Sequence, residues 1–131
     1  MANRGDLVSD DEWLYRTFWS KPPITKYLYP DGSATSRVFK LREKDKGMLS
    51  VDAKSLTTYH ASIGNDQTFV LFEVLNSEVT ALGLETVHDP LPNEEEPNRT
   101  NPAHCLIHGM TEDDDILPSA IAKKARLVKK S

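Results

Sequence analysis

The sequence predicts a single α+β domain over residues 1–131, with a mixed or antiparallel sheet flanked by short helices. The chain has 131 residues, enough for one domain that buries roughly two thirds of its unfolded surface. Residues 68–74 are almost wholly apolar, β-branched or aromatic, which is typical of a strand covered on both faces. Four more segments with strand character lie around it, at 13–19, 48–52, 84–88 and 103–108.

Composition sets limits on the class of protein. The hydrophobic fraction of 38% and the aromatic fraction of 8% indicate a folded soluble chain and argue against wholesale disorder. A net charge of −4 gives no general reason to expect nucleic-acid or anionic-membrane binding. The single cysteine, Cys105, fits a reducing compartment. Residues 1–10 lack the apolar region of an export signal, and no apolar run approaches the ~20 residues of a membrane helix. A cytoplasmic protein is therefore expected.

The first segment combines two local signals. Residues 9–12 have the pattern of a capping box and predict a turn of helix. Residues 13–19 are rich in aromatic side chains and predict a strand. In that strand Arg16 lies between the apolar Leu14 and Phe18 on one face, so its guanidinium must reach solvent or meet an anionic partner.

Turn signals divide the next part of the chain. Two prolines at 22–23 interrupt regular structure, and residues 30–33 form a Pro-Asp-Gly-Ser turn. Periodicity leaves residues 33–43 open between a short helix and an edge strand. Residues 48–52 alternate apolar and polar side chains, which predicts a short strand.

Two short helices are predicted around the core strand. Thr57 or Thr58 is expected to cap a helix over residues 59–63. After the core strand, Asn76 or Ser77 is expected to cap little more than one helical turn, which Gly83 ends before the chain continues into the 84–88 strand.

The composition changes after this strand. Residues 90–102 are rich in proline and glutamate and predict an exposed loop, either a mobile flap or an insertion without functional consequence. Residues 103–108 return to the sheet, and an acidic linker over 110–117 leads to a basic amphipathic helix over 118–130. Its apolar stripe consists of Leu117, Ile121, Ala125 and Val128.

The four histidines and the single cysteine are residue types that can bind a metal ion. Zinc sites usually contain tight local pairs such as Cys-x-x-Cys, and none occurs here. On one strand, His104 and His108 would be about 13 Å apart, too far to share an ion. We therefore expect no metal site, and Cys105 is expected to be a buried packing thiol.

His88 and Asp89 end the fourth predicted strand. Histidine can act as an acid or base when a carboxylate fixes its tautomer. Neighbouring residues of a strand point to opposite faces, so Asp89 is not expected to orient His88 directly. Asp before Pro is also a common turn starter, which is the role that we favour for Asp89.

Three elements of the chain resemble a known family. Leu14-Tyr15-Arg16, Leu49-Ser50-Val51 and the central Glu73 resemble the small α+β fold of ADP-ribosyltransferases and RES-domain toxins. In that family an arginine on the first strand, a serine or tyrosine on the next and a later glutamate surround NAD. The resemblance implies a nucleotide-binding role for Arg16, Ser50 and Glu73, although the Glu-x-Glu or Gln-x-Glu pattern of many transferases is missing.

Three functional hypotheses follow. The first is a non-enzymatic module that binds a protein partner through its aromatic residues or its basic tail. The aromatic residues are Trp13, Tyr15, Trp19, Tyr27 and Tyr29.

The second hypothesis is an enzyme or enzyme-like nucleotide binder with four candidate catalytic residues around one cleft. Arg16 would hold an anionic group, Ser50 would hydrogen-bond the substrate, and His88 or His104 would move a proton. No cofactor is assigned to this site.

The third hypothesis is a nucleic-acid accessory protein that acts through its basic tail. Five positive charges support salt-sensitive attachment but no base readout. The tail consists of Lys123, Lys124, Arg126, Lys129 and Lys130.

Overall fold

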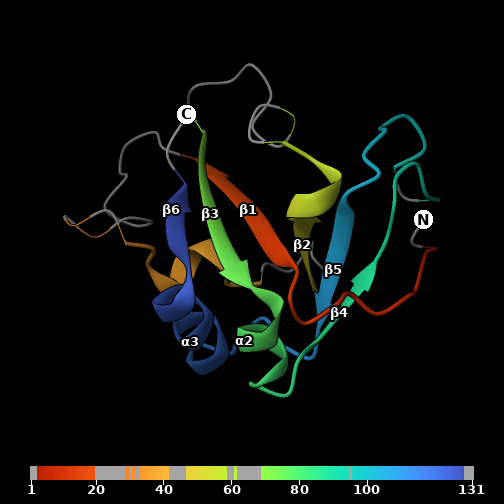
Figure 1. The fold of residues 1–131 in the computed structure, drawn as a ribbon. Helices are drawn as coiled ribbons and strands as arrows, with labels where there is room; N and C mark the ends of the chain where they lie inside the picture. The colour runs from red at the N-terminus through yellow and green to blue at the C-terminus, as the bar shows by residue number, and fades with distance from the viewer. Residues whose placement is uncertain are drawn as a thin grey trace.

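The computed structural model describes residues 3–19, 29, 31, 33–41, 47–58, 61, 69–94 and 96–128. These residues form one antiparallel sheet of six strands in the order β4-β5-β2-β1-β3-β6 (Figure 1). The α+β class is thereby confirmed, and the sheet is antiparallel and not mixed. The strands are β1 (Trp13–Trp19), β2 (Met48–Ala53), β3 (Phe69–Leu75), β4 (Glu85–His88), β5 (His104–His108) and β6 (Arg126–Val128).

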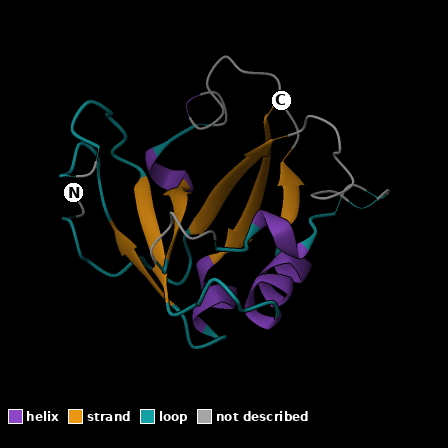
Figure 2. Ribbon diagram, turned by 180° about the vertical axis from the view of Figure 1, so that it is seen from behind, coloured by secondary structure: helices purple, strands orange, loops and turns teal. Residues whose placement is uncertain are grey.

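The helices α2 (Asn76–Thr80) and α3 (Ile116–Lys124) lie on one side of this sheet together with the 3-10 helix η2 (Ser36–Val38) (Figure 2). A second 3-10 helix, η4 (Lys54–Leu56), follows β2 and stands apart from them. Val79 of α2, Ile121 of α3 and Val38 of η2 belong to the same buried apolar cluster as the inward side chains of the strands. We call the side of the sheet that faces this cluster the helix face, and the opposite side the open face.

Strand β2 shows how the strands divide their side chains between the two faces. Leu49, Val51 and Ala53 are buried on the helix face. Because successive side chains of a strand point to opposite sides, the alternate ones belong to the open face: Met48, Ser50 and Asp52.

Strand β3 is the core strand that the sequence predicts. It pairs with β1 along one edge and with β6 along the other. Phe72 and Val74 are buried on the helix face, while Leu71 and Glu73 are buried on the open face. An almost continuous apolar run is needed here because both faces exclude water.

Two predicted helix starts are wrong in detail. Residues 9–12 form a turn, in which the Glu12 amide donates to the Ser9 carbonyl at 3.1 Å, and the Ser9 hydroxyl pairs with the Asp11 carboxylate. Helix α2 occurs where predicted, but Leu75 is its N-cap and makes no side-chain cap bond. The side-chain amide of Asn76 instead points inward, where its Nδ2 donates to the Val8 carbonyl at 3.0 Å as part of a buried hydrogen-bond network.

The predicted helix over 118–130 is not confirmed. Helix α3 spans Ile116–Lys124, and Ala125 has an extended backbone with ψ of 153°. The chain then forms β6, whose Leu127 packs against the core cluster. Strand β3 would otherwise leave an edge of backbone donors and acceptors unpaired, and pairing that edge outweighs the continuation of a helix.

Three other segments can be compared with expectation. Residues 36–38 form a 3-10 helix, so the segment 33–43 contains neither a longer helix nor an edge strand within its described part. The Thr58 hydroxyl accepts the Ala61 amide at 3.1 Å, as a cap would; most of the predicted 59–63 helix, like the prolines at 22–23, lies outside the described residues. The 90–102 segment is largely exposed, although Leu91 is buried and bridges to Asn101.

The start of the chain runs beside β4. Gly5 donates its amide to the His88 carbonyl at 2.8 Å, and Val8 donates to the Thr86 carbonyl at 2.9 Å. This pairing covers the outer edge of β4. Among the described residues, the helices are all too short or too polar to cross a membrane.

Candidate functional site

One polar side chain from each of five neighbouring strands lies in a row across the open face. The row follows directly from the strand register, since each member is the register partner of the next. Asp89, which follows β4, extends the row because its amide donates to the His104 carbonyl at 2.9 Å. We call this set the polar row: Arg126, Glu73, Tyr15, Asp52 and His104, extended by Asp89.

His104 is hydrogen-bonded at both ring nitrogens. It is buried, with 5% of its surface exposed. Its Nδ1 lies 2.9 Å from the Asp89 carbonyl oxygen and 3.1 Å from Asp89 Oδ2. Its Nε2 lies 3.3 Å from Ser50 Oγ. We call Ser50, His104 and Asp89 the relay.

The partners of His104 determine its tautomer when the ring is neutral. Nδ1 faces two oxygens of Asp89, a carbonyl and a carboxylate, and both are acceptors. Nδ1 must therefore carry the proton, which leaves a lone pair on Nε2. The Ser50 hydroxyl donates to that lone pair. A serine, a histidine acceptor and an orienting carboxylate are thus connected in the order that serine nucleophiles require.

Asp89 is fixed from the side away from the sheet. Arg4 Nε lies 3.1 Å from Asp89 Oδ1, and Asn93 Nδ2 donates to Asp89 Oδ2 at 3.0 Å. Arg4 also donates to the carbonyl of Pro92 at 3.0 Å. The segments before β1 and after β4 therefore both position the carboxylate that orients His104.

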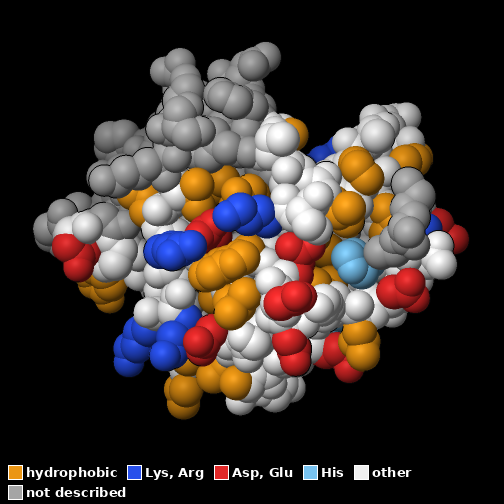
Figure 3. Space-filling model, in the orientation of Figure 1, with side chains coloured by type: hydrophobic (Ala, Val, Ile, Leu, Met, Phe, Trp, Pro, Cys, Tyr) orange, Lys and Arg blue, Asp and Glu red, His pale blue; other side chains and the backbone are white. Residues whose placement is uncertain are grey.

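The other end of the polar row is an ion cluster around a buried carboxylate. Glu73, 4% exposed, pairs with Lys54 at 3.3 Å and with Arg126. The Arg126 guanidinium lies 4.5 Å from the centre of the Trp13 ring, and Lys54 Nζ lies 5.8 Å from the centre of the Tyr15 ring. Figure 3 views this side of the molecule, where basic and acidic side chains alternate with apolar ones.

The four predicted catalytic residues divide between the two faces. Ser50 and His104 meet on the open face. Arg16 lies on the helix face, where it donates to the Val38 carbonyl at 3.0 Å and to the Ser50 carbonyl at 2.9 Å. His88 also lies on the helix face, with Nδ1 3.6 Å from Cys105 Sγ. The four side chains do not surround one cleft, because those of Arg16 and His88 point to the face opposite to that of Ser50 and His104.

The residues of the family resemblance separate in the same way. Ser50 and Glu73 are on the open face, in β2 and β3, but Arg16 points to the other side of the sheet. Glu73 is occupied by its two cations. The geometry therefore does not gather Arg16, Ser50 and Glu73 around one ligand.

Cys105 is a buried packing thiol, as expected. Burial raises the pKa of Cys105 to about 12, and the negative charge of Asp52 acts in the same direction. The thiol is therefore protonated at neutral pH and poorly suited to nucleophilic attack.

Asp89 is the member of the relay that reasoning from the sequence missed. Adjacency in the sequence relates Asp89 to His88, whose side chain lies on the helix face. The pairing of β4 with β5 could identify it. His88 pairs with Cys105 on the helix face, so the next pair in the antiparallel register, Asp89 and His104, lies on the open face.

The part of the chain that the structure describes contains no group of three His, Cys, Asp or Glu side chains able to hold a metal ion. The side chains of the relay are themselves suited to proton transfer and nucleophilic attack.

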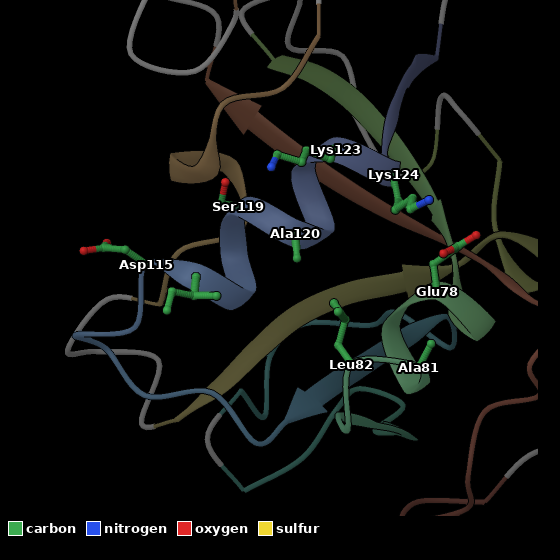
Figure 4. Close-up of a pocket in the computed structure, with 9 residues that line it drawn as sticks. Glu78, Ala81, Leu82, Asp115, Ser119, Ala120, Lys123 and Lys124 are labelled. Carbon is green, nitrogen blue, oxygen red and sulfur yellow. The ribbon is translucent and has the colours of Figure 1, made fainter.

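A separate groove of about 500 Å³ lies between α2 and α3 (Figure 4). Ile116, 81% exposed, stands at its edge. Lys123 and Lys124 line it from α3, and Leu82 lines it from the chain just after α2. The groove lies among the helices that cover the helix face, whereas the relay lies on the opposite, open face of the sheet.

In comparisons with known proteins, no protein-family model, no curated protein and no solved structure matches this chain.

Proposed function

We propose that the protein is an enzyme that cleaves an ester or a similarly activated carbonyl compound with Ser50 as nucleophile. The observation that carries the proposal is the relay, in which the His104 ring contacts Asp89 at Nδ1 and Ser50 at Nε2. A nucleophile and a base within hydrogen-bond reach, with the base oriented by a third group, is the arrangement that activates a serine hydroxyl.

The reaction would proceed in two stages. Ser50 Oγ attacks the carbonyl carbon while its proton moves to His104 Nε2, and the leaving alkoxide then takes that proton as the carbon–oxygen bond of the ester breaks. Water next attacks the acyl-Ser50 ester and loses a proton to His104, which passes it to Ser50 Oγ as the bond between that oxygen and the acyl carbon breaks. The products are a carboxylic acid, an alcohol and the restored serine. Asp89 holds the ring and stabilises the imidazolium that forms between the steps.

The experiment is hydrolysis of a series of p-nitrophenyl esters. The wild-type protein is expected to release nitrophenolate, and Ser50→Ala is expected to lower kcat by about a thousandfold because the covalent step is lost. Ser77→Ala, a replacement in α2 away from the open face, serves as the matched control and should retain full activity.

Two results would contradict the proposal. One is turnover by Ser50→Ala at the wild-type rate, and the other is no turnover of any ester by a wild-type preparation with a cooperative thermal transition. Circular dichroism of each variant separates a lost nucleophile from a lost fold.

Binding of a protein partner is a second candidate function, favoured by the exposed Ile116 beside the α2–α3 groove. The aromatic residues support it less. Tyr15 is buried, Trp13 lies under Arg126, and Tyr29 is 56% exposed; Tyr27 and the Trp19 side chain lie outside the described residues. A partner retained equally by wild type and Ile116→Glu would contradict docking at the groove.

Attachment to nucleic acid through the basic tail stays a prediction. Lys123 and Lys124 are exposed, while Arg126 is engaged with Glu73; residues 129–131 lie outside the described part. Unchanged heparin retention after removal of residues 123–131 would contradict this role.

A further inference from the structure

A pocket of about 370 Å³ lies near the end of β2 and the start of β5. One wall is the segment that follows β2, and the other is the segment that leads into β5. Its volume is within the range of small-molecule sites. The lining residues are Leu56, Thr57, Thr58 and Ala61 on the first wall, and Arg99, Thr100, Asn101 and Pro102 on the second.

The pocket is connected to the strands of the relay through Asp52. Asn101, in its wall, donates from Nδ2 to Asp52 Oδ1 at 2.9 Å. Asp52 is the register partner of His104, and it lies two residues from Ser50 on the same face of β2. The segments that form the two walls are joined at their start, where the Ala53 amide donates to the Ala103 carbonyl at 2.8 Å.

Arg99 gives this pocket a positive charge. Its side chain is 57% exposed and pairs with Glu96, three residues earlier, at 3.4 Å. Such a surface pair contributes little free energy, so a ligand can replace it at small cost. A guanidinium binds a carboxylate or a phosphate through two parallel hydrogen bonds, which gives it orientation as well as affinity.

We propose that this pocket selects substrates that carry a carboxylate or phosphate group, with Arg99 as the specificity-determining residue. The inference rests on the proposed esterase function, because it assigns the remote group of the same substrate. The anionic group binds Arg99 between the two walls, and the ester carbonyl extends along the open face toward Ser50 Oγ. Binding energy from the remote group then lowers the barrier at the reacting carbonyl.

The test compares three acyl esters of p-nitrophenol: the neutral butyrate, the succinate monoester and the 3-phosphonopropionate. The wild type is expected to have the higher kcat/KM for the two anionic esters, and their ratio distinguishes carboxylate from phosphate-like recognition. Arg99→Gln is expected to lower kcat/KM for the anionic esters by about 10- to 100-fold, the effect of one charged hydrogen-bonded contact, and to leave the butyrate unchanged. Arg37→Gln, at an exposed arginine of η2, is the matched control and should alter none of the three.

The outcomes separate this inference from the function on which it rests. Hydrolysis that depends on Ser50 but shows no loss of anionic preference in Arg99→Gln overturns the role of Arg99 and leaves the esterase proposal standing. Hydrolysis that persists in Ser50→Ala overturns the esterase proposal. A separate readout, calorimetric binding of succinate or inorganic phosphate to Ser50→Ala, is then expected to disappear in the Ser50→Ala, Arg99→Gln double variant, and equal binding by both proteins overturns the pocket.

Discussion

Asp89 determines the chemistry of His104. Its carboxylate and its carbonyl both accept from Nδ1, so the neutral ring presents a lone pair to Ser50. An asparagine at this position has nearly the same shape but no negative charge. The backbone carbonyl of residue 89 still accepts from Nδ1, so the tautomer is kept, while the carboxylate that stabilises the imidazolium is lost.

Asp89→Asn is therefore expected to lower kcat for ester hydrolysis by about 10²- to 10³-fold with little change in fold, because His104 becomes a weaker general base. Asp52→Asn is the matched control, because Asp52 lies opposite His104 but its carboxylate accepts from Asn101. Steady-state kinetics measures the loss, and ¹⁵N NMR of the imidazole nitrogens is expected to find the proton of the neutral His104 ring on Nδ1 in all three proteins. The explanation fails if Asp52→Asn costs as much as Asp89→Asn, or if the neutral ring of the wild type carries its proton on Nε2.

Among the elements, α2 and β4 are joined to the segment before β1 by a buried polar network. Asn76 is fully buried. Its Nδ2 donates to the carbonyls of Val8 and Ser9 at 3.0 and 3.2 Å, and its Oδ1 accepts the Thr86 hydroxyl at 2.7 Å. Each of these groups is buried or part-buried, so losing a partner costs its desolvation free energy.

Asn76→Ala is expected to lower the free energy of unfolding by about 2–4 kcal/mol, since it leaves more than one buried group without its partner. Glu85→Ala, an exposed position on β4 next to Thr86, should change it by less than about 0.5 kcal/mol. Urea denaturation measures both. Equal stability of the two variants would show that the network contributes nothing beyond packing.

Elements could be predicted where one pattern was dominant. The apolar run of β3 and the alternation of β2 each fit one kind of strand. The segment from Leu117 to Val128 fits a helical stripe throughout, yet its last residues form β6. The unpaired edge of β3 decides in favour of β6, and a local pattern carries no information about that edge.

For the molecule as a whole, the site depends on strand order. Ser50 and His104 could be selected from the sequence as polar residues of predicted strands. Their meeting requires β2 beside β5, two strands far apart in the chain. Asp89 joins them because β4 lies on the other side of β5. Arg16 and His88 could not be separated from the relay without knowing which face each strand turns to the helices.

The central claim is that His104 activates Ser50. A fluorophosphonate tests it directly, because an activated serine forms an oxygen–phosphorus bond with it as fluoride leaves and the proton passes to the histidine. After incubation, peptide mapping by mass spectrometry is expected to find the adduct on Ser50 in the wild type and to find none there in His104→Gln. An unmodified Ser50 in the wild type, or equal modification of Ser50 in both proteins, would contradict the claim.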